Sequence, residues 1–201
     1  MDRTDHDEVA LRSRKTALRS QLTARRAQMD DPERAVSGHS LRDAVLSLPE
    51  TQMAGTVAAY ISVGTEPQTR SLVYALWKRG AYVLLPLLQP DYDLDWASYE
   101  GPDSLAPGPR GLLQPTEPPR GVNAVTSADL VIVPALAVDR GGRRLGRGGG
   151  SYDRALARVG AAVPTVALIY DDELLDEVPA GPLDQRVRMA ARPRQGITRL
   201  R

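Results

Sequence analysis

Residues 130–169 read LVIVPALAVDRGGRRLGRGGGSYDRALARVGAAVPTVALI. This stretch opens on a short apolar run, Leu130 to Val133, and closes on another, Thr165 to Ile169. Short runs rich in β-branched residues are typical of buried strands. The segment from about Tyr152 to Val159, which lies between them, predicts a helix. A strand, a helix and a second strand in this order predict two parallel strands joined by a helical crossover.

A second unit of the same kind lies upstream. Thr56 to Val63 reads TVAAYISV and ends at Gly64, which predicts a buried strand. A helix is predicted from about Gln68 to Arg79, and a further strand from Tyr82 to Leu85. Strands that alternate with helices predict an α/β fold with a mainly parallel central sheet flanked by helices.

Two N-terminal helices are predicted to precede the sheet, over about residues 9–48. The first, about 9–28, repeats leucine at near-helical spacing among arginines. The second begins at Asp31-Pro32-Glu33, an N-cap candidate followed by proline at the first helical position, and runs to about Leu48.

The segment 101–123 holds six prolines and four glycines, which predicts no regular secondary structure. So long a loop is either a binding element or a linker, and the sequence leaves both possibilities open. Because neither flank has enough strands for an independent sheet, we expect residues 1–201 to form a single α/β domain.

Composition and charge exclude several classes of function. The net charge is only +1, which argues against nucleic acid or an anionic membrane as the main partner. Cysteine is absent and only two histidines occur, so thiol chemistry, histidine triads and histidine-bound zinc are not expected. No apolar run has the length of a membrane span or of a signal peptide, so we expect a cytoplasmic protein. We further expect a monomer that acts on a small molecule.

The most informative stretch is Arg144 to Arg154, RLGRGGGSYDR. Its four glycines leave backbone N–H groups free to converge on an anion, and the positive end of the following helix favours the same charge. Arg144, Arg147 and Arg154 can add charge-assisted hydrogen bonds, so phosphate is the expected ligand. The spacing matches neither the P-loop nor GxGxxG, and a purely structural hinge stays an alternative.

With its neighbours, this stretch resembles the signature of the 5-formyltetrahydrofolate cyclo-ligases, also called methenyltetrahydrofolate synthetases. The order of features from Val133 to Arg154, VPALAVD followed by RLGRGGGSYDR, carries the resemblance. It extends to residues 15–19 on the first helix, to residues 60–62 with Glu66, and to residues 111–115 in the proline-rich loop. The chain departs from the family pattern, which commonly has Glu, Tyr, Phe and His, at Gln114, Ser151, Val138 and Leu183.

The resemblance implies ATP-dependent cyclisation of 5-formyltetrahydrofolate to 5,10-methenyltetrahydrofolate, with release of ADP and phosphate. The formyl oxygen is phosphorylated first, and the neighbouring amine nitrogen then attacks the activated carbon. This chemistry depends on alignment and cationic stabilisation rather than on a protein nucleophile, which suits a chain without cysteine. A reduced folate is then the substrate, and ATP and Mg²⁺ are the implied cofactors.

The resemblance also implies roles for individual residues. The nucleotide is expected to contact Lys15, Arg19, Arg144, Leu145, Gly146, Arg147, Gly148, Gly149, Gly150, Ser151, Tyr152 and Arg154. The folate is expected to contact Ile61, Glu66, Arg147, Gly148, Gly149, Gly150 and Ser151. Lys15, Arg147 and Tyr152 are assigned to catalysis, and Asp153 and Asp184 to the metal.

Each charged candidate also has a purely structural interpretation. Lys15 and Arg19 are spaced i, i+4, so they share a helix face that can simply be solvated. Asp153 suits the start of a helix without any metal. Glu66 and Asp184 can be ordinary turn residues.

Tyr152 can stack on a flat ring or pack under the turn. Trp96 can line the folate pocket, although packing in the core or in a lid is the favoured interpretation.

Two functions of other classes compete with the enzyme. The first is a non-catalytic nucleotide- or nucleic-acid-binding module that uses the arginine-rich first helix and the glycine turn; the near-zero net charge counts against nucleic acid. The second is a nucleotide-sugar or dinucleotide enzyme, against which the missing GxGxxG spacing argues.

Overall fold

The computed structural model describes the backbone of residues 3–201 and the side chains from His6 onward. Within these residues the central sheet has seven strands, in the order β12-β11-β9-β6-β1-β2-β3. Their bounds are β1 Thr56–Ala58, β2 Tyr82–Leu88, β3 Leu94–Ser98, β6 Leu130–Pro134, β9 Thr165–Leu168, β11 Met189–Arg192 and β12 Gly196–Arg199. The neighbours from β11 to β2 pair in parallel, and the edge strands β3 and β12 are antiparallel. The predicted fold class, a mainly parallel sheet flanked by helices, is confirmed.

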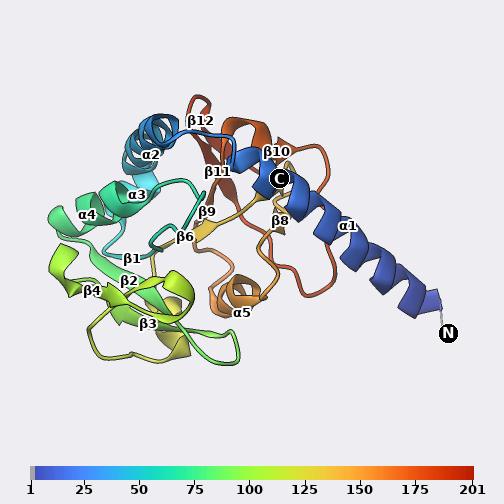
Figure 1. Cartoon of the computed structure of the whole chain (residues 1–201). Helices are drawn as coiled ribbons and strands as arrows, with labels where there is room; N and C mark the ends of the chain where they lie inside the picture. The colour runs from blue at the N-terminus through green and yellow to red at the C-terminus, as the bar shows by residue number, and fades with distance from the viewer. Residues whose placement is uncertain (1–2) are drawn as a thin grey trace.

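Helices cover both faces of this sheet (Figure 1). On one face lie α2 (Asp31–Leu46), α3 (Pro49–Met53) and α4 (Arg70–Lys78), and on the other lies α5 (Ser151–Arg158). Alternate strand residues supply the two cores, as the pleat requires. Val57, Val83 and Ile132 join the core beneath α2 and α4, whereas their neighbours Ala58 and Leu84 face the core beneath α5.

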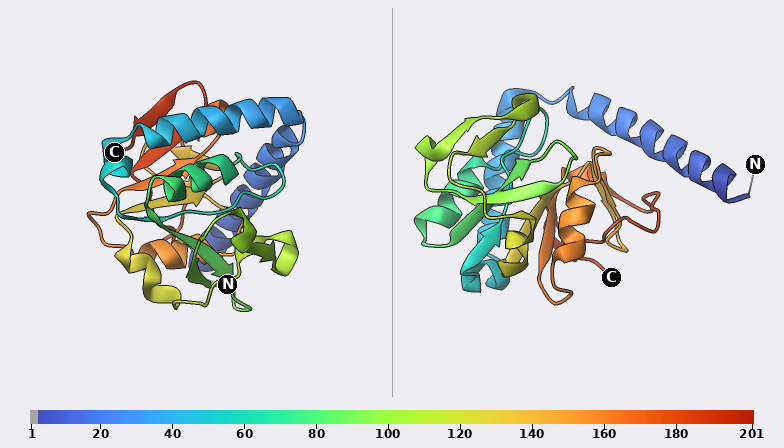
Figure 2. Two further views of the ribbon diagram at one scale, coloured as in Figure 1. Left: turned by 90° about the vertical axis from the view of Figure 1, so that its left-hand side faces the viewer. Right: turned by 90° about the horizontal axis from the view of Figure 1, so that it is seen from below.

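The first helix, α1 (Arg3–Arg26), is an arm whose N-terminal half projects from the body of the molecule (Figure 2). Its C-terminal half is anchored, because Leu22 is buried among Leu136, Leu145 and Val178. The helix begins at Arg3, earlier than the predicted start at about residue 9. Its C-terminal half lies beside the glycine turn, where Arg19 donates to the carbonyl of Gly146.

Two small sheets complete the described chain. One pairs β7 (Ala137–Asp139) with β8 (Arg144–Leu145) and β10 (Leu174–Leu175), and the other is a hairpin of β4 (Leu105–Pro107) and β5 (Leu113–Pro115). Short 3₁₀ turns occur at η1 Pro102–Ser104, η2 Pro109–Gly111, η3 Val122–Ser127 and η4 Asp171–Glu173. Within residues 3–201, none of the helices combines the length and the apolar character that crossing a bilayer needs.

Two sequence-based predictions about these elements were wrong. The strand predicted over Thr56 to Val63 leaves the sheet after Ala58, since local side chains bind the backbone of the next residues. The Thr69 hydroxyl donates to the carbonyl of Tyr60 at 2.7 Å and accepts from the N–H of Ser62 at 2.8 Å. The segment 101–123, predicted to be irregular, contains the β4–β5 hairpin, in which Pro107 and Pro115 stand at strand ends.

Candidate active site

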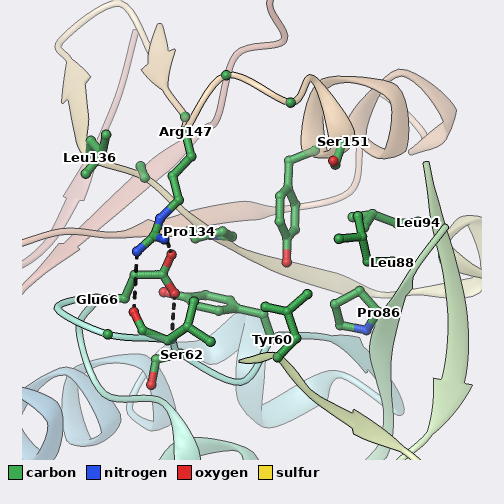
Figure 3. A pocket seen from close by; sticks show the side chains of 18 of the residues that line it. Tyr60, Ser62, Glu66, Pro86, Leu88, Leu94, Pro134, Leu136, Arg147 and Ser151 are labelled. Carbon is green, nitrogen blue, oxygen red and sulfur yellow. Dashed lines mark hydrogen bonds and ion pairs between the residues drawn. The ribbon is translucent and has the colours of Figure 1, made fainter. Parts of the chain in front are cut away.

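A cavity of about 830 Å³ opens at the carboxyl ends of β1 and β6. In the sheet, β1 pairs with β2 on one side and with β6 on the other. The order of the strands therefore reverses between β1 and β6. Ligands of open α/β sheets bind at such switch points. Figure 3 shows walls from residues 60–66 after β1, residues 134–136 at the end of β6, the glycine turn and the β2–β3 hairpin. The first helix adds Lys15 and Arg19 to the lining.

The glycine turn presents a row of free backbone donors to this cavity. Within the described chain, the N–H groups of residues 146–150 donate no hydrogen bond, and α5 begins directly after them at Ser151. Gly148 and Gly150 have φ angles of 107° and 68°, a region that side chains rarely allow. Unpaired amides beside a helix N-terminus are suited to bind phosphate oxygens.

Arg19 reaches this turn from α1. Its Nε donates to the carbonyl of Gly146 at 2.9 Å, and its guanidinium carbon would lie 3.4 Å from a Cβ placed on Gly148. Among the described residues Arg19 forms no ion pair, so its remaining N–H groups are available to an anion on the turn. The helical pair Lys15 and Arg19 thus faces the cavity rather than solvent alone.

Two carboxylates lie at the same wall, each beside a cation. Lys15 Nζ donates to Asp184 Oδ2 at 2.5 Å, and Arg144 Nη2 donates to Asp153 Oδ1 at 2.9 Å. The N–H of Gln185, next to Asp184, also donates to Asp153 Oδ1 at 3.1 Å, which brings the two acidic residues close together. In the described structure the second oxygen of each carboxylate accepts no hydrogen bond from the protein.

Glu66 forms the opposite wall, where it is only 6% exposed. Its Oε2 accepts from the N–H of Val63 at 2.9 Å, and Arg147 Nε lies 3.1 Å from its Oε1. Burial raises the pKa of this carboxyl, against the lowering by the Val63 N–H and the Arg147 charge. Arg147 therefore spans from the glycine turn to Glu66, as Figure 3 shows.

Aromatic side chains lie between these two walls. The rings of Tyr60 and Tyr152 meet edge to face, with centroids 6.5 Å apart. Burial raises the pKa of Tyr152 well above its usual range, with a further rise from Glu66. Ile61 lines the cavity beside Tyr60. A flat apolar ring with one polar edge suits this pocket.

The structure gathers the predicted site residues around this cavity with one exception, Arg154. Arg154 Nη2 donates instead to the carbonyls of Gly149 and Asp91, so it holds the β2–β3 turn against α5.

Trp96 is 1% exposed in the core beneath α5, which confirms the packing interpretation. Of the four family departures, Ser151 alone lines the cavity, and Leu183 is 84% exposed.

Sequence reasoning missed several cavity residues. Arg26 and Tyr60 lie in its floor, and Tyr92 and Arg110 lie at its rim. Tyr92 and Arg110 carry positive φ angles of 66° and 59°, and the Arg110 guanidinium stacks 4.3 Å from the Tyr92 ring centroid. Their contact joins two hairpin turns, and no local pattern of the sequence signals it.

The family comparison agrees with the order of motifs along the chain. The model of the 5-formyltetrahydrofolate cyclo-ligase family matches residues 11–193. The chain belongs to the 5-formyltetrahydrofolate cyclo-ligase family. The match extends over nearly all of the structure described above, including Lys15, Glu66 and the glycine turn.

Relatives of this family resemble the chain in both sequence and fold. The 5-formyltetrahydrofolate cyclo-ligase of Mycolicibacterium smegmatis is 43% identical over 73% of this chain and 77% of its own length. The Escherichia coli cyclo-ligase is 31% identical over 73% of this chain and 82% of its own length. The NMR structure of the Aquifex aeolicus 5,10-methenyltetrahydrofolate synthetase matches with a TM-score of 0.80 and 26% identity, covering 93% of each chain. The predicted enzyme class is confirmed, in preference to a non-catalytic module.

Proposed function

We propose that this cyclo-ligase uses ATP and Mg²⁺ to convert 5-formyltetrahydrofolate into 5,10-methenyltetrahydrofolate, as a cytoplasmic monomer folded into one domain. One observation carries the proposal. The unpaired N–H groups of residues 146–150 face the same cavity as the buried carboxylate of Glu66. A donor row suited to phosphate and an acceptor suited to an amino-substituted ring thus lie on facing walls of one pocket.

In this arrangement the glycine turn and Arg19 hold the phosphates. Lys15 has three N–H donors and directs one to Asp184, so two are left for a terminal phosphate. Arg147 lies between the turn and Glu66, where its charge stabilises the phosphoryl group during transfer to the formyl oxygen. Binding energy from both ends of the pocket aligns that oxygen with the phosphate.

Asp153 and Asp184 fit the magnesium assignment. Each offers a carboxylate oxygen that is free of protein hydrogen bonds, and the two lie at the wall where the phosphates are proposed to bind. Magnesium prefers one or two carboxylates together with phosphate oxygens and water. The described residues contain no cluster of three acidic or histidine ligands, so phosphate oxygens and water would complete the shell. The ion would neutralise charge on the phosphates.

The deciding experiment incubates the purified protein with 5-formyltetrahydrofolate, ATP and Mg²⁺. We expect a product that absorbs at longer wavelength, as the conjugated methenyl form does, with one ADP released per product. Omission of ATP or chelation of Mg²⁺ should stop the reaction. Product formation without ATP, or ADP release without folate conversion, would contradict the proposal.

Gly148→Ala tests the phosphate cradle. The new methyl group at φ 107° costs about 1–2 kcal/mol in backbone strain, and it would contact the Arg19 guanidinium at van der Waals distance. The free turn relieves this strain by leaving its present geometry, which ATP must then restore on binding. We expect KM for ATP to rise about 10-fold, because an energy of about 1.4 kcal/mol corresponds to a factor of ten. Steady-state kinetics at varied ATP measure this change.

Gly196→Ala is the matched control. Gly196 also has a positive φ, 66°, but a Cβ there meets nothing within 4 Å, and it opens β12 at the far edge of the sheet. This variant should lose similar stability and keep its KM for ATP. Equal kinetic losses in both variants would assign the glycine turn a merely structural role.

A further inference from the structure

A buried hydroxyl in the cavity wall lacks a hydrogen-bond partner among the described residues. Tyr60 is 2% exposed, and its Oη is buried without any hydrogen-bond partner among the described residues. Buried polar atoms of native proteins are normally paired, so an exception requires a reason. The neighbouring charged side chains Glu66 and Arg26 do have partners. Glu66 binds Val63 and Arg147, and Arg26 binds Glu173 and the carbonyl of Ala135.

The position of this hydroxyl limits which group of a ligand it can bind. Tyr60 lines the cavity and lies beside Glu66 in Figure 3. Its ring is held edge to face against Tyr152. Burial raises the pKa of Tyr60 well above its usual value, and the Glu66 carboxylate adds to the rise, so the hydroxyl keeps its proton at neutral pH.

Hydrogen-bond chemistry separates the roles of the two side chains. A carboxylate such as Glu66 can only accept, whereas a phenol can donate. The pyrimidine edge of a reduced pterin carries an amino group and a ring N–H, which donate, next to a carbonyl oxygen, which accepts. Glu66 alone would leave that carbonyl oxygen buried without a donor.

We propose that Tyr60 is a further substrate-binding residue, whose hydroxyl donates to the carbonyl oxygen of the pterin edge while Glu66 accepts from the adjacent N–H groups. This inference rests on the proposed function, and it deepens the folate side of the same site. It also explains why an unpaired hydroxyl occurs at this place. The group is satisfied only in the complex.

Tyr60→Phe tests this assignment, because it removes the hydroxyl and keeps the ring. We expect KM for 5-formyltetrahydrofolate to rise about 10-fold, with kcat and KM for ATP within about twofold of the wild type. The melting temperature of the ligand-free protein should stay equal or rise, since the variant no longer buries an unpaired hydroxyl.

Tyr82→Phe is a matched control. The Tyr82 Oη is also buried without a partner among the described residues, but Tyr82 is not part of the cavity wall. This variant should show the same thermal behaviour with unchanged KM for folate. An unchanged KM in Tyr60→Phe, or a lowered melting temperature with kcat and both KM values altered together, would overturn the assignment. If the wild-type protein converted no 5-formyltetrahydrofolate, the proposed function itself would be wrong, rather than the role of Tyr60.

Discussion

Lys15→Ala is expected to lower kcat/KM for ATP by about 100-fold or more, the usual cost of removing one preorganised charge from a transition state. The ammonium group comes from α1, yet it lies in the cavity at 2.5 Å from Asp184. Under the proposed function, its loss removes a cation from the transferring phosphoryl group and leaves an additional negative charge at the same wall. Coupled measurement of ADP release at varied ATP gives the ratio.

The chain provides its own control, because Lys78 is the second of only two lysines. Lys78 is exposed at the end of α4 against the rings of Tyr74 and Trp77, away from the cavity. Lys78→Ala should keep kcat/KM within about twofold of the wild type. Circular dichroism of both variants should be unchanged. If Lys15→Ala retained more than about a third of wild-type kcat/KM, the assignment of Lys15 to the phosphates would be wrong.

Arg26→Met is expected to lower the free energy of unfolding by about 3–5 kcal/mol, the cost of leaving one partner of a buried ion pair alone. Arg26 and Glu173 are each 2% exposed and form two hydrogen bonds of 2.7 Å. Arg26 also donates to the carbonyl of Ala135 at 2.6 Å, so it ties the end of α1 to the segment after β6. Urea unfolding followed by circular dichroism measures the change.

Arg12→Ala serves as the comparison, because Arg12 pairs with Glu8 on the exposed face of α1. Exposed pairs contribute little, and we expect a change of at most about 0.5 kcal/mol. The double variant Arg26→Met with Glu173→Leu should recover much of the loss, since it buries no unpaired charge. A loss below about 1 kcal/mol in Arg26→Met would show that the pair does not anchor α1.

The secondary structure was predictable wherever an element depends on its own residues. The strand at Leu130 and the helix after the glycine turn follow from apolar runs and glycine placement, and both appear within two residues of their predicted bounds. The strands β3, β7 and β10 were missed, because short segments gain strand geometry only from the neighbour they pair with. Tyr60 to Val63, rich in strand formers, leaves the sheet because its backbone bonds to the side chains of Thr69 and Glu66.

Among the candidate site residues, too, some could be predicted from the sequence and others could not. The glycine turn, Lys15 and Glu66 stand out in the sequence, because they belong to motifs of fixed order. Arg26 belongs to no motif, and the motif that contains Tyr60 does not mark its hydroxyl. A hydroxyl without a partner and an ion pair 147 residues apart exist only once the chain is folded. Arg154 illustrates the reverse case. It belongs to the motif, yet its guanidinium binds backbone carbonyls beside α5.

By itself the sequence determined the alternation of strands and helices and the position of the glycine turn, because periodicity and glycine placement act over a few residues. The order of its motifs pointed to the family. Only the tertiary structure decided which side chains share the cavity. Lys15 meets Asp184, Arg19 meets Gly146 and Arg147 meets Glu66 across separations of 81 to 169 residues in the chain. Such contacts depend on how α1, β1 and the glycine turn pack at one edge of the sheet, and local propensity carries no information about that packing.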